Sequence, residues 1–456
     1  MNEEMNKYEI LNALLTARSY REFTATINEM NPIDIADYMD TLQDEMLIRA
    51  FRLLKKDVAA EVFTEISSAA RDKIIVCTTD NDLAYIVEEL FVDDAVDLLE
   101  ELPAGMVKRI LKASKPETRM LINKFLSYPD GSVGSIMTAE YTDLKKNMTA
   151  AEALEQIRKT GQNKETVYTT YVTNASRVLE GIVSLKDLLF AKDDELVGDI
   201  METDIVSSLT TDDQETAAAI IAKYNFLALP VVDKENRLVG IVTVDDAINV
   251  IHEEATEDIE MMAAISPTSK SYMETSTYET WKKRIPWLLI LMLSATFTGS
   301  IITHYESALG AYVILTAFIP MIMNSGGNAG GQSSVTVIRG LSLGEIGIKD
   351  IFRVLFKEFK VAFLCALTLS AVNFVKVMIF DFGFKFNAEN LLLALIVSVT
   401  LFCTIIFAKL IGSALPILAK RIGLDPTVMA SPFITTIVDA LSLIIYFQFA
   451  TTLLGI

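Results

Sequence analysis

The chain has 456 residues, enough for about three domains, and a formal net charge of −20. Residues 286–456 hold eight acidic against ten basic residues, so the acidic excess lies in residues 1–285. Acidic surfaces repel nucleic acid, whose binding depends on Lys and Arg neutralising phosphates, so we exclude nucleic acid as a partner and expect cations instead. The three cysteines define no disulfide framework, and the first residues lack the pattern of a secretory signal. We therefore expect the acidic part to be cytoplasmic.

Residues 1–130 predict an acidic, all-α domain. Apolar residues recur three and four apart in short segments such as ILNALLTARSY and AVDLLEELP, which is typical of amphipathic helices. Repeated short helices indicate a right-angled stack or superhelix, and no metal motif or catalytic triad is present. One segment, EELFVDDAVDLLEEL, places Asp93, Asp94 and Asp97 on neighbouring turns. A solvated acidic face and a regulatory cation site both explain that segment.

An internal repeat follows. The segment VGSIMTAEYTDL begins at Val133, and VGDIMETDIVSSL begins 64 residues later at Val197. Each copy ends in a strand followed by a helix, GIVSLKDLL in the first and GIVTVDDAI in the second. A fixed spacing of this kind predicts two copies of one supersecondary unit packed against each other.

This repeat resembles a tandem pair of CBS domains, an α/β fold, over residues 131–252, divided at about 131–196 and 197–252. In that family the ending of each copy can bind the ribose of an adenine nucleotide. The matching residues here are Ser184 with Asp187 and Thr243 with Asp246. The resemblance thus allows ATP as a ligand of the CBS pair, although many CBS pairs bind no nucleotide.

Residues 253–285 predict an acidic connecting helix and a linker. Between residues 193 and 260 there are eighteen acidic against three basic residues, a self-repulsion that counter-ions would relieve. Magnesium binds oxygen ligands, keeps several waters and commonly uses one or two carboxylates per ion. A solvated acidic helix is the alternative. The candidate regulatory ligands in this region are Asp245, Asp246, Glu253, Glu254, Glu257 and Asp258.

Residues 286–456 predict a membrane domain of five α-helices. The apolar runs lie near residues 286–303, 309–324, 361–380, 391–415 and 428–452. Lys and Arg gather in the connections between the second and third runs and between the fourth and fifth. By the positive-inside rule, the N-terminus lies in the cytoplasm and the C-terminus outside.

Two features of this domain point to an ion path. Asp439 lies inside the last apolar run, where a carboxylate costs about 2.5 to 3.5 kcal/mol and usually faces a bundle interior or a wet cavity. A protonated Asp bonded to a neighbouring helix is the alternative. The second run contains Pro320 and enters NSGGNAGGQSS, so we expect the helix to break into a turn that lines a cavity. Tight packing of small residues also explains the glycines.

The order of these parts resembles the MgtE family of magnesium channels over essentially the whole chain. The most specific matches are Pro320, residues 326–332, Asp425 with Pro426, and the ITTIVD run that ends at Asp439. The resemblance implies a homodimer in the cell membrane with a pore on its two-fold axis, magnesium as both cargo and regulator, and a hydrated ion held at Asp439. The residues that it implies for the pore are Asp439, Asn328, Thr435 and Thr436, with Pro320, Gly326, Gly327 and Gln332 in the turn.

Three other functions compete with this one. A CBS-regulated transporter of another ion, such as Mn²⁺ or Co²⁺, fits the same parts, whereas the intramembrane acid argues against an anion channel. A nucleotide or magnesium sensor without transport is the second alternative. A membrane enzyme is the third, but His252 and His304 are the only histidines and no nucleophile motif is present, so we expect no enzymatic activity.

Overall fold

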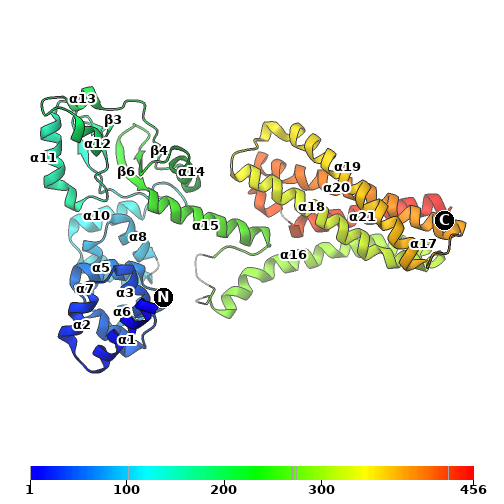
Figure 1. Cartoon of the computed structure of the whole chain (residues 1–456), viewed down its shortest axis with the longest axis horizontal. Helices are drawn as coiled ribbons and strands as arrows, with labels where there is room; N and C mark the ends of the chain where they lie inside the picture. The colour runs from blue at the N-terminus through cyan, green and yellow to red at the C-terminus, as the bar shows by residue number, and fades with distance from the viewer. Residues whose placement is uncertain (1, 101, 269–271, 274, 430, 456) are drawn as a thin grey trace. The chain divides into compact units, whose positions relative to one another are not determined.

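The computed structural model describes residues 2–100, 102–268, 272–273, 275–429 and 431–455 (Figure 1). It divides the chain into two compact units, Met1–His252 and Glu253–Ile456. The first unit contains the predicted helical domain and the internal repeat. The second contains the long apolar helices.

Short helices form the N-terminal domain, as predicted. Helices α3, α5, α7 and α9 pack in succession, and α4 packs on α6 and α8 on α10. The bounds are α1 Asn2–Thr16, α2 Tyr20–Ile27, α3 Pro32–Asp40, α4 Asp44–Phe51, α5 Lys56–Glu65, α6 Ser68–Cys77, α7 Asp80–Glu89, α8 Val92–Glu100, α9 Ala104–Ala113 and α10 Pro116–Phe125.

A recurring hydrogen bond joins successive steps of this stack. A polar side chain from one step accepts a hydrogen bond from a backbone N–H at the start of a helix 27 residues later, where such groups have no partner within the helix. The pairs are Asn28 with Lys55 at 2.8 Å, Asp40 with Ser67 at 3.2 Å and Glu88 with Lys115 at 2.7 Å. The stack is therefore held by helix capping as well as by apolar contact.

The repeat folds into two small sheets of the same design. In each sheet the first two strands are parallel and the last two antiparallel. The strands are β1 Asp143–Leu144, β2 Thr169–Thr173, β3 Leu179–Ser184, β4 Ser208–Leu209, β5 Ala228–Val232 and β6 Leu238–Thr243. The helices are α11 Ala150–Thr160, η1 Gly161–Asn163, α12 Leu185–Phe190, α13 Val197–Ile200 and α14 Gln214–Tyr224.

The two copies exchange backbone pairs. Thr138, near the start of the first copy, pairs with Ile241 in β6 of the second, and Glu202, near the start of the second, pairs with Ile182 in β3. A Cβ atom on Gly240 would lie 2.5 Å from the Thr138 carbonyl oxygen. The glycine of the repeated GIV motif therefore lets the other copy's chain approach closely.

One apolar core joins the N-terminal domain to the second copy of the repeat. It includes Leu98 and Leu99 of α8 together with Met137, Leu229 and Val242 of the repeat. The acidic residues of α8 are consequently held in a fixed place beside the repeat. Helix α15 (Val244–Met262) follows β6 directly and contains the predicted connecting helix as its second half.

The second unit consists mainly of long helices (Figure 1). Among its described residues, four segments are long and apolar enough to span a membrane: Thr277–His304, Ile348–Asp381, Ala388–Arg421 and Pro426–Leu454. The elements are α16 Thr277–His304, α17 Glu306–Ala311, η2 Val313–Phe318, α18 Ile319–Ser342, η3 Ile348–Asp350, α19 Ile351–Lys376, η4 Val377–Asp381, α20 Ala388–Arg421, η5 Pro426–Met429 and α21 Ser431–Leu454.

The second predicted span lies later in the sequence than expected, and the predicted turn is wrong. Residues 313–318 form a 3₁₀ helix, and α18 begins at Ile319 and runs unbroken through the glycine cluster to Ser342. Pro320 lies in the first turn of this helix, where its missing N–H costs no hydrogen bond. Helix α18 has 24 residues and is the fifth long helix of this unit. Because of its polar face, it is not among the four apolar segments given above.

Close packing explains why the glycines remain helical. A Cβ atom on Gly412 of α20 would lie 2.2 Å from the carbonyl oxygen of Gly330, so the two backbones touch. On the same face of α18, a Cβ atom on Gly326 would lie 2.9 Å from Val438 of α21. Each glycine costs about 1 kcal/mol of helix propensity, which these contacts between helices offset.

We expect Gly412→Ala to lower the thermal stability of the membrane unit, because its new methyl group collides with the α18 backbone and overpacking costs about 1 to 3 kcal/mol. Gly299→Ala is the matched control, since a Cβ atom on Gly299 of α16 meets nothing within 4 Å. The measurement is the melting temperature of the detergent-solubilised protein. Equal melting temperatures for the two variants would contradict the close approach of α18 and α20.

Candidate functional site

Helix α18 has one polar face and one face of small residues. Asn324, Asn328 and Gln332 recur every fourth residue and are exposed, and the Asn328 amide Nδ2 donates to Asn324 Oδ1 at 3.2 Å. Gly326 and Gly330 lie on the opposite, buried face. We call the three exposed residues 324, 328 and 332 the amide stripe.

Helix α21 places Asp439 at the level of the amide stripe. A Cβ atom on Gly327 would lie 3.0 Å from Thr435, and one on Gly326 would lie 2.9 Å from Ser442, so the two helices run antiparallel. Asp439 is one turn after Thr435 and therefore on the same side of α21. Its side chain is half-buried, and its buried Oδ1 atom has no hydrogen-bond partner among the described residues. A carboxylate oxygen without a partner inside a bundle can accept an external ligand.

The two other predicted pore residues, Thr436 and Pro320, have different surroundings. Thr436 Oγ1 lies 3.5 Å from Ser294 Oγ, so this side chain is directed to α16 and away from the amide stripe. Pro320 is exposed at the first turn of α18. The structure thus packs Gly326 and Gly327 against the side of α21 near Thr435 and Asp439, aligns Pro320 with the amide stripe, and directs Thr436 to α16.

The first unit contains a cluster of carboxylates between α8 and the repeat. Asp93 and Asp94 of α8 interact electrostatically with Asp246 at the start of α15 and with Glu165 of the first repeat copy. Only 9% of Asp93 is exposed, and its Oδ1 atom has no hydrogen-bond partner in the described chain. We call Asp93, Asp94, Glu165, Asp245 and Asp246 the interdomain acidic cluster.

Burial and like charge raise the pKa values in this cluster. Burial, followed by the charge of Asp246, raises the pKa of Asp94 to about 6 and holds that of Asp93 well above its usual value. Burial, with Asp245 and Asp246 next, raises the pKa of Glu165 to about 7. Burial also raises the pKa of Asp246, against the hydrogen bond from Thr243. Burial and like charge therefore disfavour the charged forms of these carboxyls.

Sequence reasoning named four of these five residues and missed Glu165. It comes from the loop before β2 and has no neighbouring motif that would mark it. Asp97 is exposed one turn further along α8. Across the described residues, no group of three or more His, Cys, Asp or Glu side chains is arranged to hold a bare metal ion.

The second unit has an acidic cluster of its own on the last turns of α15. Burial, with Asp425 as the largest charge contribution, raises the pKa of Asp258 to about 6. The pKa of Glu257 is raised by burial, then by the negative charge of Glu254 and then by that of Asp425. Burial and Glu254 also raise the pKa of Glu253. The Asp425–Pro426 pair, noted in the sequence for its motif alone, thus faces the connecting helix, where Thr427 Oγ1 lies 3.7 Å from the sulfur of Met261.

Both candidate nucleotide motifs cap helices. Ser184 Oγ accepts from the Asp187 backbone N–H at 3.1 Å and pairs with its carboxylate at the start of α12. Thr243 makes the equivalent bond to Asp246 at the start of α15. The two copies therefore present the same polar pair, and Asp246 belongs both to its motif and to the interdomain acidic cluster.

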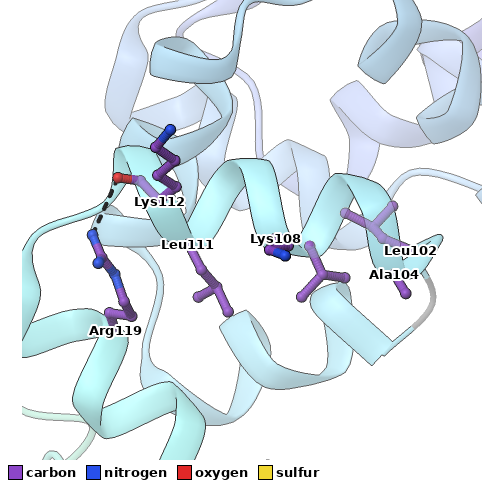
Figure 2. Close-up of a pocket in the computed structure, with 7 residues that line it drawn as sticks. Leu102, Ala104, Lys108, Leu111, Lys112 and Arg119 are labelled. Atoms are coloured by element: carbon purple, nitrogen blue, oxygen red, sulfur yellow. Dashed lines mark hydrogen bonds between the residues drawn. The ribbon is translucent and has the colours of Figure 1, made fainter.

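The N-terminal domain also has a surface pocket (Figure 2). Figure 2 shows Arg119 of α10 donating to the carbonyl oxygen of Lys112 at the end of α9. The charged side chains of this pocket are basic, which does not suit a divalent cation. Its lining residues are Leu102, Ala104, Val107, Lys108, Leu111, Lys112 and Arg119.

The interdomain acidic cluster predicts how stability depends on pH. Its carboxyls have folded-state pKa values above their unfolded ones, so the folded state holds more protons, and stability present at about pH 4 is lost as pH rises through these values. We expect the melting temperature of residues 1–262, without divalent cations, to decrease between about pH 5 and pH 8. The triple variant Asp93→Asn, Asp94→Asn, Glu165→Gln should flatten this dependence, and an equally steep decrease in the variant would refute the assignment.

Comparison with known proteins identifies the domains. Residues 319–449 match the family of the MgtE divalent cation transporter domain, residues 30–131 match the MgtE intracellular N domain, and residues 133–194 and 197–253 match CBS domains. The chain is 36% identical to the magnesium transporter MgtE of Thermus thermophilus over 95% of each chain. It is 33% identical to the magnesium transporter MgtE of Bacillus subtilis over 96% of this chain and 95% of that protein.

Solved structures resemble the cytosolic part. The soluble part of a magnesium transporter matches with 30% identity and a TM-score of 0.53, over 55% of this chain and 99% of that one. The cytosolic domain of the Mg²⁺ channel MgtE in complex with ATP matches with 34% identity and a TM-score of 0.51, over 53% of this chain and 98% of that one. From the domain order and the identity along nearly its whole length, the chain belongs to the MgtE family of divalent cation transporters.

Proposed function

We propose that this chain carries Mg²⁺ across the cytoplasmic membrane, through a path lined by the amide stripe of α18 and by Asp439 of α21. The observation that carries the proposal is the unpartnered carboxylate oxygen of Asp439 at the level of Asn324 and Asn328. Named relatives at 33% and 36% identity transport magnesium by their descriptions, which supports this cargo.

The exposed amide stripe supports a path between two copies of the chain. Polar side chains in membrane helices usually face a bundle interior or a water-filled cavity, because lipid cannot satisfy them. The buried face of α18 already packs on α20 and α21. A homodimer that encloses the stripe of each copy would form an aqueous axis with two Asp439 side chains. The positive-inside pattern gives this dimer a cytoplasmic N-terminus and an outer C-terminus.

The chemistry of the path suits a hydrated ion. Magnesium loses its waters reluctantly. Amide oxygens and a carboxylate can accept hydrogen bonds from those waters without stripping them. Weak binding of this kind selects cations by the charge of Asp439 and still allows the ion to leave. Mn²⁺ and Co²⁺ are the alternative cargoes, and a transport assay with each ion distinguishes them.

The two acidic clusters are the candidate regulatory sites. Two unit charges 4 Å apart interact by about 4 kcal/mol at an effective dielectric constant of 20, so carboxylates held together by the fold repel strongly without a cation. When cytosolic magnesium is high, bound ions relieve this repulsion and hold the closed arrangement. When magnesium falls, the acidic residues separate and the path opens. Asp93 supports this role because it is buried with an unpartnered oxygen.

ATP is the candidate second ligand of the CBS pair. The related cytosolic domain of 34% identity was crystallised with ATP. Ser184 with Asp187, and Thr243 with Asp246, are the residues that would meet the ribose. Because Asp246 also belongs to the interdomain acidic cluster, nucleotide and magnesium would act on the same helix start.

Asp439→Asn should reduce Mg²⁺ uptake into proteoliposomes by about tenfold or more, since one charge removed from the path removes the selection for cations. The control is Asp381→Asn, which removes an acid paired with Lys376 at the end of α19. Both variants should elute from size exclusion as the wild type does. Uptake retained by Asp439→Asn would refute the path.

Neutralising the acidic clusters should keep the channel open at high cytosolic magnesium. We expect this result for Asp93→Asn with Asp94→Asn, and for Glu257→Gln with Asp258→Asn, because the charges that magnesium would bridge are gone. The measurement is uptake as a function of magnesium on the cytosolic face. Asp193→Asn with Asp194→Asn is the control, since these acids belong to neither cluster. Normal closure of both cluster variants would exclude the regulatory assignment.

A further inference from the structure

Three polar side chains meet inside the membrane unit, away from Asp439. Ser333 of α18 donates from Oγ to Glu358 Oε2 of α19 at 2.7 Å. Lys409 of α20 donates from Nζ to the same Ser333 hydroxyl oxygen at 3.2 Å. The exposed fractions are 2% for Ser333, 9% for Glu358 and 5% for Lys409, so the network is buried within the protein. One hydroxyl therefore links two opposite charges from two other helices.

Stability alone does not explain such a network. Charged residues in membrane helices are costly, and a buried ion pair can often be replaced by apolar residues with no loss of stability. Charged residues that occur in membrane helices despite this cost usually have a structural or functional role. Because Lys409 and Glu358 come from different helices and both bond to Ser333, their shared effect is on the position of α18.

The network sits beside the part of α18 where packing is tightest. Gly330 touches the backbone of Gly412, and Ser334 Oγ donates to the Met429 carbonyl oxygen at 2.9 Å. Ser333 directly follows Gln332, the last member of the amide stripe. Successive residues of a helix differ by about 100° around its axis, so a bond that fixes Ser333 also fixes the direction of Gln332 and of the stripe.

We propose that Lys409, Ser333 and Glu358 form a positioning network that sets the rotation of α18 about its axis and so determines how well the amide stripe discriminates Mg²⁺ from the larger Ca²⁺. The inference rests on the proposed function, because it concerns the selectivity of that same path. For hydrated ions, discrimination depends on how rigidly the stripe matches the octahedral water shell of Mg²⁺, because the shell of Ca²⁺ is larger and more variable. If α18 can rotate, the amide stripe also accepts Ca²⁺, whose coordination geometry is more variable than that of Mg²⁺.

The test variant is Glu358→Met with Lys409→Met in the full-length protein. It removes both charges with side chains of similar length, so no unpaired charge is left buried. We expect the melting temperature to stay close to that of the wild type, while the ratio of Mg²⁺ to Ca²⁺ uptake in proteoliposomes falls by about tenfold. Ser333→Ala removes the bridging hydroxyl and should lower the ratio in the same direction.

The matched control is Asn373→Ala with Ser398→Ala. Asn373 Nδ2 donates to Ser398 Oγ at 3.3 Å and joins α19 to α20 at another buried point, through a bond that involves no residue of α18. This control should lower the melting temperature and leave the ion ratio unchanged. An unchanged ratio in Glu358→Met with Lys409→Met, or an equal fall in the control, would overturn the proposal.

Hydrogen exchange separates this proposal from the proposed function. The α18 amides should exchange faster in Glu358→Met with Lys409→Met than in the wild type, whether or not the wild type carries magnesium. If the wild type transports no Mg²⁺, the proposed function fails, and faster exchange still supports the positioning of α18. Equal exchange in α18 would overturn the positioning role itself.

Discussion

The close approach of α18 to α20 and α21 is the constraint on which the membrane unit depends. Where Gly330 and Gly412 meet, there is no room for a side chain between the backbones. One face of α18 is thereby committed to small residues, and the amides gather on the other face. The same contact that packs the helix thus presents its polar stripe.

Polar groups in the membrane unit are of two kinds. Lys409 and Glu358 satisfy each other through Ser333, so they hold protein to protein. Asp439 keeps a buried oxygen without a partner in the described structure, so it can bind something else. A paired group fixes geometry, whereas an unpaired one can bind an ion. The paired charges lie on α19 and α20, and Asp439 lies on α21.

Repulsion between carboxylates is built into both units. The shared apolar core of α8 and the repeat holds Asp93 and Asp94 beside Asp246, and the loop at Asp425 faces Asp258. Neither arrangement stabilises the fold at neutral pH, because burial and like charge raise the pKa values of these groups. Packing therefore holds like charges close together, and a hydrated cation would reduce their repulsion. This repulsion connects the fold of the cytosolic part to the regulation that we propose.

The sequence by itself determined the features that are encoded locally. The 64-residue repeat, the acidic excess before residue 286, the apolar runs and the lone Asp439 are all patterns of neighbouring residues, and the repeat, the helical domain and most of the long helices are confirmed. Only the tertiary structure decided that NSGGNAGGQSS is helical, because the partners that replace its weak helix propensity come from α20 and α21. Glu165, Asp425 and the link from Lys409 through Ser333 to Glu358 likewise depend on segments far apart in the chain. No pattern of neighbouring residues in the sequence predicts these contacts, because only tertiary packing brings the side chains together.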